Sequence, residues 1–85
     1  MDAKAYKTWL DGVRERVKAA RDELKLSLRA AADLTGVPFK SIHRVEASDF
    51  VPTLEVLYRL AVGYGVTVGA LLCEEETAKP RGKKK

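Results

Sequence analysis

The side chains best suited to chemistry are three basic residues spaced over about one helical turn in the middle of the chain. Lys40, His43 and Arg44 lie in a stretch, residues 36–45, that contains no acidic residue. Ammonium and guanidinium groups donate hydrogen bonds and carry positive charge, so they bind phosphates and the acceptor atoms on base edges. The spacing therefore indicates a binding surface that recognises a ligand rich in negative charge and acceptor atoms.

Catalysis and metal binding have no comparable support in the sequence. The chain has one histidine and one cysteine, His43 and Cys73, so the ligand spacing of a zinc site is absent. No nucleophile or paired carboxylate accompanies His43 as a general base would require. We therefore predict a protein that is not an enzyme and has no cofactor and no metal. The single cysteine also excludes an internal disulfide and fits a reducing compartment.

The basic residues are positioned by a helix-turn-helix pattern in residues 27–48. Ser27 is expected to cap the first helix, because its hydroxyl can accept a hydrogen bond from a free amide of the first turn. Gly36 is placed where the chain must reverse direction, and glycine adopts the left-handed conformation there at no steric cost. In the second helix Ile42 and Val45 share the inward face, which leaves the basic residues outside. The predicted inner face of the first helix consists of Leu28, Ala31, Ala32 and Leu34.

The same residues resemble a known family. The pattern S-L-R-x-x-A-x-x-T-G-V-x-x-x-S-I-x-R-V-E, followed by Pro52-Thr53-Leu54, Leu60-Ala61, Gly65-Val66 and Leu71-Leu72, is similar to the lambda-repressor-like (Cro/cI-type) helix-turn-helix DNA-binding domain. The resemblance covers residues 13–72 and implies an all-α, compact five-helix bundle that binds double-stranded DNA. Two positions depart from the family: Pro38 replaces a hydroxyl residue that often caps the recognition helix, and Ser48 stands where glycine is common.

The resemblance also implies which residues meet DNA. By position, the base contacts fall on Phe39, Lys40 and Arg44 of a recognition helix over residues 39–46. Arg44 is able to bond both acceptors of a guanine, whereas Phe39 offers only an apolar contact to a thymine methyl group. A core position at the edge of the helix is an equal alternative for Phe39. Contacts to the DNA backbone or flanking the bases are expected from Ser27, Arg29, Ser41, His43, Ser48 and Thr53.

Two further predictions concern how the recognition helix is held and paired. Glu46 lies four residues after Ile42, at the edge of the core, where an unpaired carboxylate is costly. The family places a matching arginine at Arg21, so we predict an Arg21–Glu46 pair that locks the recognition helix onto the first helix. Family members join near the last helix, which implies a homodimer whose interface contains Val66, Val68, Leu71 and Leu72.

An amphipathic pattern predicts one long first helix over residues 3–24, although Gly12 would also permit a start near Asp11. Residues 1–12 are then an N-terminal helical extension to a DNA-binding domain over residues 13–74. Tyr6, Trp9 and Leu10 are expected to cover the core of this domain, with a dimer contact as the alternative. The apolar positions of the pattern are Tyr6, Trp9, Leu10, Val13, Val17, Ala20 and Leu24.

Two short helices and a tail complete the predicted architecture. Thr53 caps a helix that ends near Val62, because Gly63 and Gly65 interrupt it. A second helix follows over residues 68–74, and residues 75–85 form a disordered, basic tail. The predicted buried side of the helix that Thr53 caps consists of Leu54, Leu57, Tyr58, Leu60 and Ala61.

Composition sets the scale of the protein and its compartment. Eighty-five residues with 46% hydrophobic content are sufficient for one small globular domain. The net charge of +4 arises from the five cations of residues 79–85, so residues 1–78 carry −1 and any basic character is local. No membrane-spanning run or signal peptide is present. We expect a cytoplasmic protein that does not contact membranes and is nucleoid-associated when bound.

The leading hypothesis is a transcription regulator of prokaryotic or phage type, a repressor or autoregulator that binds a palindromic operator as a homodimer. A regulatory protein partner is compatible with the absence of an effector domain in this sequence. The alternative is a protein-interaction module of antitoxin or antiactivator type, whose helix-turn-helix mainly binds another protein. Exposure of Tyr6, Trp9 and Leu10 would favour this alternative.

Overall fold

The computed structural model describes residues 3–47 and 50–73, which form an all-α bundle as the sequence predicts. The helices in the described part of the chain are α1 (Ala3–Glu23), α2 (Leu28–Thr35), α3 (Phe39–Ala47), α4 (Leu54–Tyr64) and α5 (Val68–Leu72). Ser48 and the predicted tail over residues 75–85 lie outside the described residues. No helix in the described ranges is long and apolar enough to cross a membrane.

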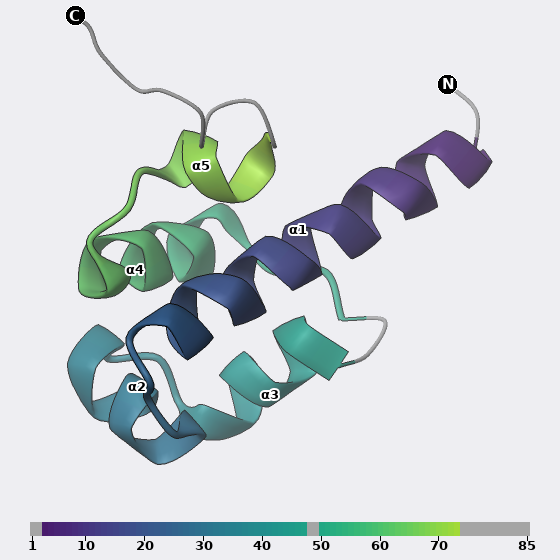
Figure 1. Cartoon of the computed structure of the whole chain (residues 1–85). Coiled ribbons are helices and arrows are strands. Elements are labelled where there is room, and N and C mark those ends of the chain that lie inside the picture. Colours follow the sequence, from purple (N-terminus) through teal and green to yellow (C-terminus); the bar gives the residue numbers. More distant parts are fainter. Residues whose placement is uncertain (1–2, 48–49, 74–85) are drawn as a thin grey trace, which may run out of the picture.

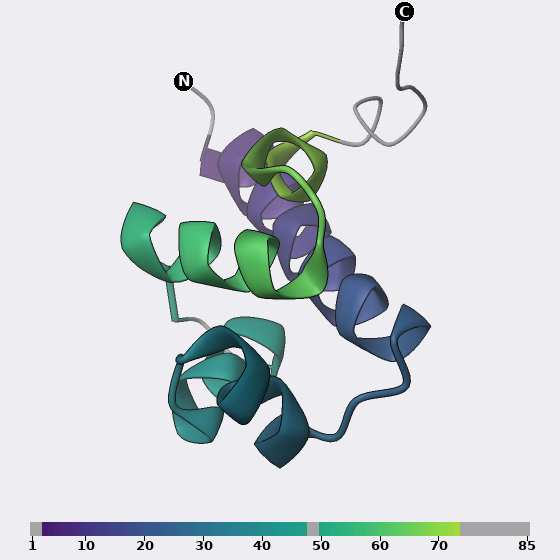
Figure 2. The same cartoon turned by 90° about the vertical axis from the view of Figure 1, so that its left-hand side faces the viewer.

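The long helix α1 forms the spine of the bundle. In Figure 1 it runs diagonally across the molecule, with α2 and α3 on one side and α4 and α5 on the other. The view turned by 90° shows α2 and α3 crossing at the lower end, with α4 above them (Figure 2). The helix-turn-helix is thus one end of the molecule, and α1, α4 and α5 support it.

A single core joins all five helices and the turn between α2 and α3. Val17 of α1, Ile42 and Val45 of α3 and Leu60 of α4 are completely buried. Val37, which the sequence analysis left out of the core, is also buried at 1% exposure and anchors the turn from inside. The core cluster consists of Val13, Val17, Ala31, Val37, Ile42, Val45, Leu57, Leu60, Ala61, Tyr64 and Leu71.

Local hydrogen bonds set where the short helices begin and end. Ser27, Thr53 and Thr67 each accept a hydrogen bond from the amide three residues later, at 3.0, 3.1 and 3.0 Å, and so cap α2, α4 and α5. Each such cap contributes about 1 kcal/mol. Gly36 and Gly65 end α2 and α4 with φ angles of 79° and 75°, a left-handed conformation in which other residues are strained. The capping predictions are confirmed.

The prediction of an unbroken first helix is also confirmed, because α1 continues through Gly12. Its apolar residues, however, do not all face inward. Leu10 is buried, whereas Tyr6 and Trp9 remain 39% and 45% exposed. Leu24 lies beyond the end of α1 and is also 45% exposed, so its predicted place on the inner face is wrong.

Three predicted inner residues point outward instead. Leu54 and Tyr58 are 74% and 61% exposed, because α4 turns its other side to the core. Leu34 is 52% exposed, since α2 buries Ala31 and the end of the helix rather than Leu34. The last helix, α5, ends at Leu72 and is shorter than predicted. The buried side of α4 consists of Leu57, Leu60, Ala61 and Tyr64.

Gly63 does not interrupt α4, contrary to prediction, but allows α4 to pack closely on α2. A Cβ atom at Gly63 would lie 2.5 Å from Cγ2 and 3.0 Å from Cα of Thr35. Both distances are shorter than the normal contact between carbon atoms. Thr35 is the last residue of α2, so this glycine lets α4 support the position at which the turn to α3 begins.

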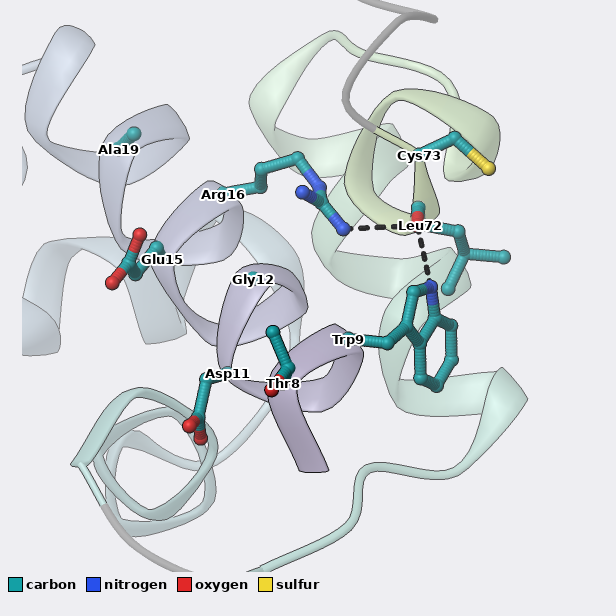
Figure 3. A pocket seen from close by; sticks show the side chains of 9 residues that line it. All are labelled: Thr8, Trp9, Asp11, Gly12, Glu15, Arg16, Ala19, Leu72 and Cys73. Carbon is teal, nitrogen blue, oxygen red and sulfur yellow. Dashed lines mark hydrogen bonds between the residues drawn. The ribbon is translucent and has the colours of Figure 1, made fainter. Parts of the chain in front are cut away.

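Helix α1 holds α5 in place through two side chains. The Nε1 atom of Trp9 donates a hydrogen bond to the carbonyl oxygen of Leu72 at 3.0 Å. Arg16 donates from Nε to the carbonyl of Leu71 at 2.8 Å and from Nη2 to that of Leu72 at 2.9 Å (Figure 3). The last carbonyls of a helix have no partner within the helix. Trp9 and Arg16 supply partners to the carbonyls at the C-terminal end of α5, and Trp9 is the one of the two that belongs to the predicted extension over residues 1–12.

Candidate nucleic-acid interface

The recognition helix α3 has one buried side and one basic side. Ile42 and Val45 are 0% exposed and fix the helix to the core. Lys40, His43 and Arg44 are exposed on the other side, as their spacing predicts. Because the apolar side is fully buried, α3 has little freedom to rotate about its axis. The basic side chains therefore project from a rigid support.

Phe39 lies at the start of α3 beneath a side chain from α2. The guanidinium carbon of Arg29 is 4.6 Å from the centre of the Phe39 ring, which is a cation–π contact. The ring is half-buried. It belongs neither to the fully buried core nor to the fully solvated surface, so the two alternatives predicted for Phe39 stay open. Arg29, which is predicted to contact the DNA backbone, is exposed and lies over this ring.

A shallow depression on this surface combines apolar and basic side chains. Leu28 and Phe39 supply its apolar part, and Lys40, His43 and Arg44 surround them. All three residues predicted to contact bases are thus brought together in one concave place. Sequence reasoning missed Leu28 as part of this site, because its position next to the Ser27 cap indicated only a core residue. None of the residues that line the depression is acidic.

The recognition helix is tied to α1 by an ion pair between Arg21 and Glu46. Nε and Nη2 of Arg21 donate to the two carboxylate oxygens of Glu46, each at 2.8 Å. The Glu46 side chain is 6% exposed and that of Arg21 is 14% exposed. Arg21 also donates from Nη1 to the carbonyl of Leu26 at 2.7 Å. The structure brings the predicted pair together in the two-point geometry that arginine and carboxylate favour.

Tyr64 of α4 lies near this pair and was not anticipated from the sequence. Tyr64 is 5% exposed, and its hydroxyl oxygen has no hydrogen-bond partner among the described residues. The pKa of Tyr64 is raised to about 12, chiefly by burial and also by the negative charge of Glu46, while the positive charge of Arg21 opposes the rise. The hydrogen bond from Arg21 to Glu46 likewise raises the pKa of Arg21. Glu46 thus disfavours loss of a proton from both neighbours.

The residues predicted to flank the bases occupy different surroundings. Ser27 and Thr53 are exposed and use their hydroxyl oxygens as helix caps. Ser41 is half-buried within α3, and His43 is exposed beside Arg44. Since the capping oxygens accept hydrogen bonds, the hydroxyl protons of the two caps stay available to a phosphate oxygen.

The residues predicted for a dimer interface differ in their exposure. Leu71 is 2% exposed and belongs to the core, so it has no surface to offer a second copy. Val68 and Leu72 are partly buried and pack against the same core. Val66 is 37% exposed in the turn before α5. The short helix α5 attaches to the core through Leu71, so this side chain does not reach the surface.

A second depression lies between α1 and the end of α5, and it carries no reactive cluster. Arg16 and Trp9 project into it and are engaged with the α5 carbonyls (Figure 3). Cys73 is exposed at its rim. Within residues 3–47 and 50–73, no group of three or more histidine, cysteine, aspartate or glutamate residues is placed to hold a metal ion.

Comparison with known proteins agrees with the geometry of α2 and α3. The model of the helix-turn-helix family matches residues 17–71, from the second half of α1 to α5. No curated protein and no solved structure gives a significant match. The matched region includes the whole helix-turn-helix, the Arg21–Glu46 pair and all of α4. Since it spans more than half of the chain, the chain belongs to the helix-turn-helix family of Cro/cI type, a family of DNA-binding regulatory domains.

Proposed function

We propose that this protein is a transcription regulator that places α3 in the major groove of duplex DNA. The observation that carries the proposal is the division of α3 into two sides. Ile42 and Val45 are buried, while Lys40, His43 and Arg44 are exposed around a depression. A helix that presents a few donors near its N-terminal end is the usual means of contacting base edges in this class of domain.

The side chains of the site suggest distinct roles. Arg44 contacts the O6 and N7 acceptors of a guanine through its planar guanidinium, and Lys40 contacts a phosphate or a second guanine. Phe39 and Leu28 form the apolar part of the depression. The C5-methyl group of thymine is the apolar group that base edges present in the major groove. The site is therefore suited to a half-site that contains a guanine next to a thymine.

The remaining polar groups position the domain on the backbone. Ser27, Ser41 and Thr53 carry hydroxyl groups near α2 and α3, and the N-terminal end of α2 has amides that attract phosphate. These contacts carry no information about sequence but fix the register of α3 on the duplex.

One recognition helix contacts too few base pairs to define a unique genomic site. We therefore propose that a homodimer binds a palindromic operator whose half-sites are about 34 Å apart. The proposed mode of action is repression or autoregulation through occupancy of the operator. A regulatory protein partner would act by changing that occupancy.

Selection of binding sequences from randomised duplex DNA tests the proposal. We expect the wild-type chain to enrich a palindrome, and Arg44→Ala to lose preference for one guanine per half-site, at a cost of about 1–3 kcal/mol. Lys18→Ala is the matched control, because Lys18 is an exposed cation on α1 that lies outside the depression. Enrichment of no sequence by the wild-type chain would contradict the proposal, and equal preference with and without Arg44 would contradict its assignment.

The alternative of a protein-interaction module has partial support. Tyr6 and Trp9 are exposed on α1, although Leu10 is buried. The same selection separates the two functions. A module that mainly binds protein would bind DNA only through non-specific electrostatic attraction to the phosphates. That binding would fall steeply as the salt concentration rises.

A further inference from the structure

The outer side of α4 carries a continuous apolar stripe. Leu54, Tyr58 and Val62 are 74%, 61% and 61% exposed, and they are spaced four residues apart. Residues at this spacing are neighbours on one side of a helix. Val51 before the helix and Val66 after it are 52% and 37% exposed and extend the stripe in sequence. Both views place α4 at the outside of the bundle (Figures 1 and 2).

Large apolar side chains gathered on one exposed side of a helix mark an interaction surface. The rest of this chain offers no segment to cover it. Residues 74–85 read EEETAKPRGKKK, and residues 48–49 are serine and aspartate. These segments are polar or charged, apart from a single alanine and a proline, so they cannot replace water around three large apolar groups. DNA is equally unsuited, because its outer surface is formed by phosphates.

We propose that a second copy of this chain covers the stripe, with the two α4 helices antiparallel across a two-fold axis at Tyr58. In a two-fold interface the same surface is used by both copies. An axis at Tyr58 sets Leu54 of one copy against Val62 of the other, in both directions, because these residues are equally far from Tyr58 along the helix. The two Tyr58 rings then meet at the centre, where an aromatic pair adds about 0.5–1.5 kcal/mol to the burial of its area.

Charge beside the stripe supports the antiparallel orientation. Glu55 and Arg59 lie along one edge of the stripe and form an exposed ion pair, with Oε2 and Nη2 at 2.9 Å. An axis at Tyr58 brings Glu55 of one copy to within about 3 Å, measured along the helix axis, of Arg59 of the other, given a rise of about 1.5 Å per residue. The order along that edge is then Glu55, Arg59 of the other copy, Arg59 and Glu55 of the other copy, so each glutamate has an arginine of the other copy as its neighbour. A parallel two-fold arrangement would instead place the Glu55–Arg59 edges of the two copies on opposite sides of the contact, too far apart for charges of one copy to pair with those of the other.

The expected dimer is weak. A stable interface of standard size buries about 800 Å² per partner, and the stripe of a single short helix offers less than this. We expect dissociation in the micromolar range, with DNA that carries two half-sites strengthening association by holding both copies. The inference names the partner surface of the proposed DNA-binding homodimer. It is nevertheless tested without DNA, so that its failure and the failure of the proposed function are distinguishable.

Cross-linking provides the first test. In a Cys73→Ser background, which removes the exposed native thiol, Tyr58→Cys places a thiol on the two-fold axis. A glutathione redox buffer should then convert Tyr58→Cys into a covalent dimer. Leu34→Cys is the matched control, since Leu34 is also exposed, at 52%, but lies on α2. A yield for Tyr58→Cys no greater than that for Leu34→Cys would overturn the proposal.

Charge reversal provides the second test and needs no new thiol. Glu55→Arg gives a copy with two cations along the edge, and Arg59→Glu gives a copy with two anions. In analytical ultracentrifugation we expect each variant alone to associate at least several-fold more weakly than the wild type. An equimolar mixture of the two should recover association. A mixture no heavier than its components, or a wild-type chain that stays monomeric at millimolar concentration, would overturn the proposal.

Separate measurement of DNA binding keeps the two proposals apart. A wild-type chain that enriches a DNA sequence, but stays monomeric and fails to cross-link, would contradict the α4 interface and leave the proposed function standing. A chain that dimerises through Tyr58 but enriches no DNA sequence would contradict the proposed function and leave the α4 interface standing.

Discussion

Phe39 gives the basic surface of α3 an apolar centre, and this combination limits what the surface can bind. Arg29 covers one face of the ring, while Leu28 lies next to it in the same depression. Removing water from apolar side chains is favourable only if an apolar group replaces the water. In a groove lined by hydrogen-bonding atoms, the methyl group of thymine is that group. A single aromatic residue thus adds a requirement that charge alone would not impose.

We expect substitution of thymine by deoxyuridine to reveal this contact. The change removes the C5-methyl group and leaves all hydrogen-bonding atoms in place. At one position per half-site of the selected operator, affinity should fall about four-fold, since a buried methyl group contributes about 0.8 kcal/mol. Electrophoretic mobility shifts with singly substituted duplexes measure the effect. Phe39→Ala should abolish the difference between thymine and deoxyuridine, and Arg44→Ala should retain it. Sensitivity at no position would show that Phe39 does not meet a methyl group.

The raised pKa of Tyr64 predicts that the folded protein loses stability in alkaline solution. Its pKa is about 12 in the folded chain, against an ordinary value of 10.0. The unfolded chain therefore loses the proton first as pH rises, so the contribution to stability is complete below about pH 10 and disappears between about pH 10 and 12. Two pKa units correspond to roughly 2–3 kcal/mol. Urea unfolding across this range measures the decline.

The variant Tyr64→Phe is the control for this prediction. It removes the titrating hydroxyl, so the decline between pH 10 and 12 should become shallower. At neutral pH we expect it to be neutral or slightly stabilising, because the hydroxyl oxygen is buried without a partner among the described residues. An identical alkaline decline in both proteins would show that other groups cause it.

At the scale of elements, two contacts decide how firmly α3 is held. Arg21 and Glu46 join α3 to α1, and the close packing of Gly63 on Thr35 joins α4 to the end of α2. The recognition helix thus depends on both neighbours of the helix-turn-helix. Each contact can be removed separately, since they share no residue.

Removing one member of the Arg21–Glu46 pair should be more harmful than removing both. Arg21→Ala leaves the carboxylate of Glu46, whose side chain is 6% exposed, without its partner. We expect this change to lower the free energy of unfolding by about 3–5 kcal/mol. A double-mutant cycle with Glu46→Ala, followed by urea unfolding, should show that the two losses are not additive. Arg59→Ala, which breaks an exposed pair, should cost less than about 1 kcal/mol. Additive losses would contradict a buried, coupled pair.

Gly63→Ala should destabilise the fold even though alanine is the better helix former. The added Cβ would lie 2.5 Å from Cγ2 of Thr35, so α4 and α2 must separate. Overpacking of this kind costs about 1–3 kcal/mol. Thr35→Ser in the same chain removes the clashing methyl group and should restore part of the loss. Val62→Ala at the exposed neighbouring position serves as the reference and should change stability by about 0.5 kcal/mol or less. Unchanged thermal unfolding of Gly63→Ala would contradict the close packing.

Across the whole molecule, local features could be predicted from the sequence. The orientation of the helices could be predicted only in part. The Ser27 cap, the left-handed Gly36 and the alternation of Ile42 with Arg44 depend on residues close in sequence, so the helix-turn-helix and its basic side were predicted correctly. In α4, both sides are apolar, and periodicity cannot decide which one faces the core. In the structure, the side of α4 that faces the core consists of Leu57, Leu60, Ala61 and Tyr64.

Contacts between distant segments account for what the sequence did not reveal. Gly63 resembles a helix breaker until Thr35 of another helix is placed beside it. The stacking of Arg29 on Phe39 likewise joins two helices across the turn. The burial of Leu71 likewise depends on contacts between distant segments, because α5 attaches to the core through that side chain.

The indole of Trp9 supplies a built-in optical probe of one helix. It is the only tryptophan of the chain, and its nitrogen is bonded to the carbonyl of Leu72 at the end of α5. Release of α5 therefore changes the fluorescence of a reporter that lies outside the helix-turn-helix. Circular dichroism, in contrast, follows all helices together. Emission that shifts at a lower denaturant concentration than helicity would record the terminal helix detaching while the DNA-binding unit is still folded.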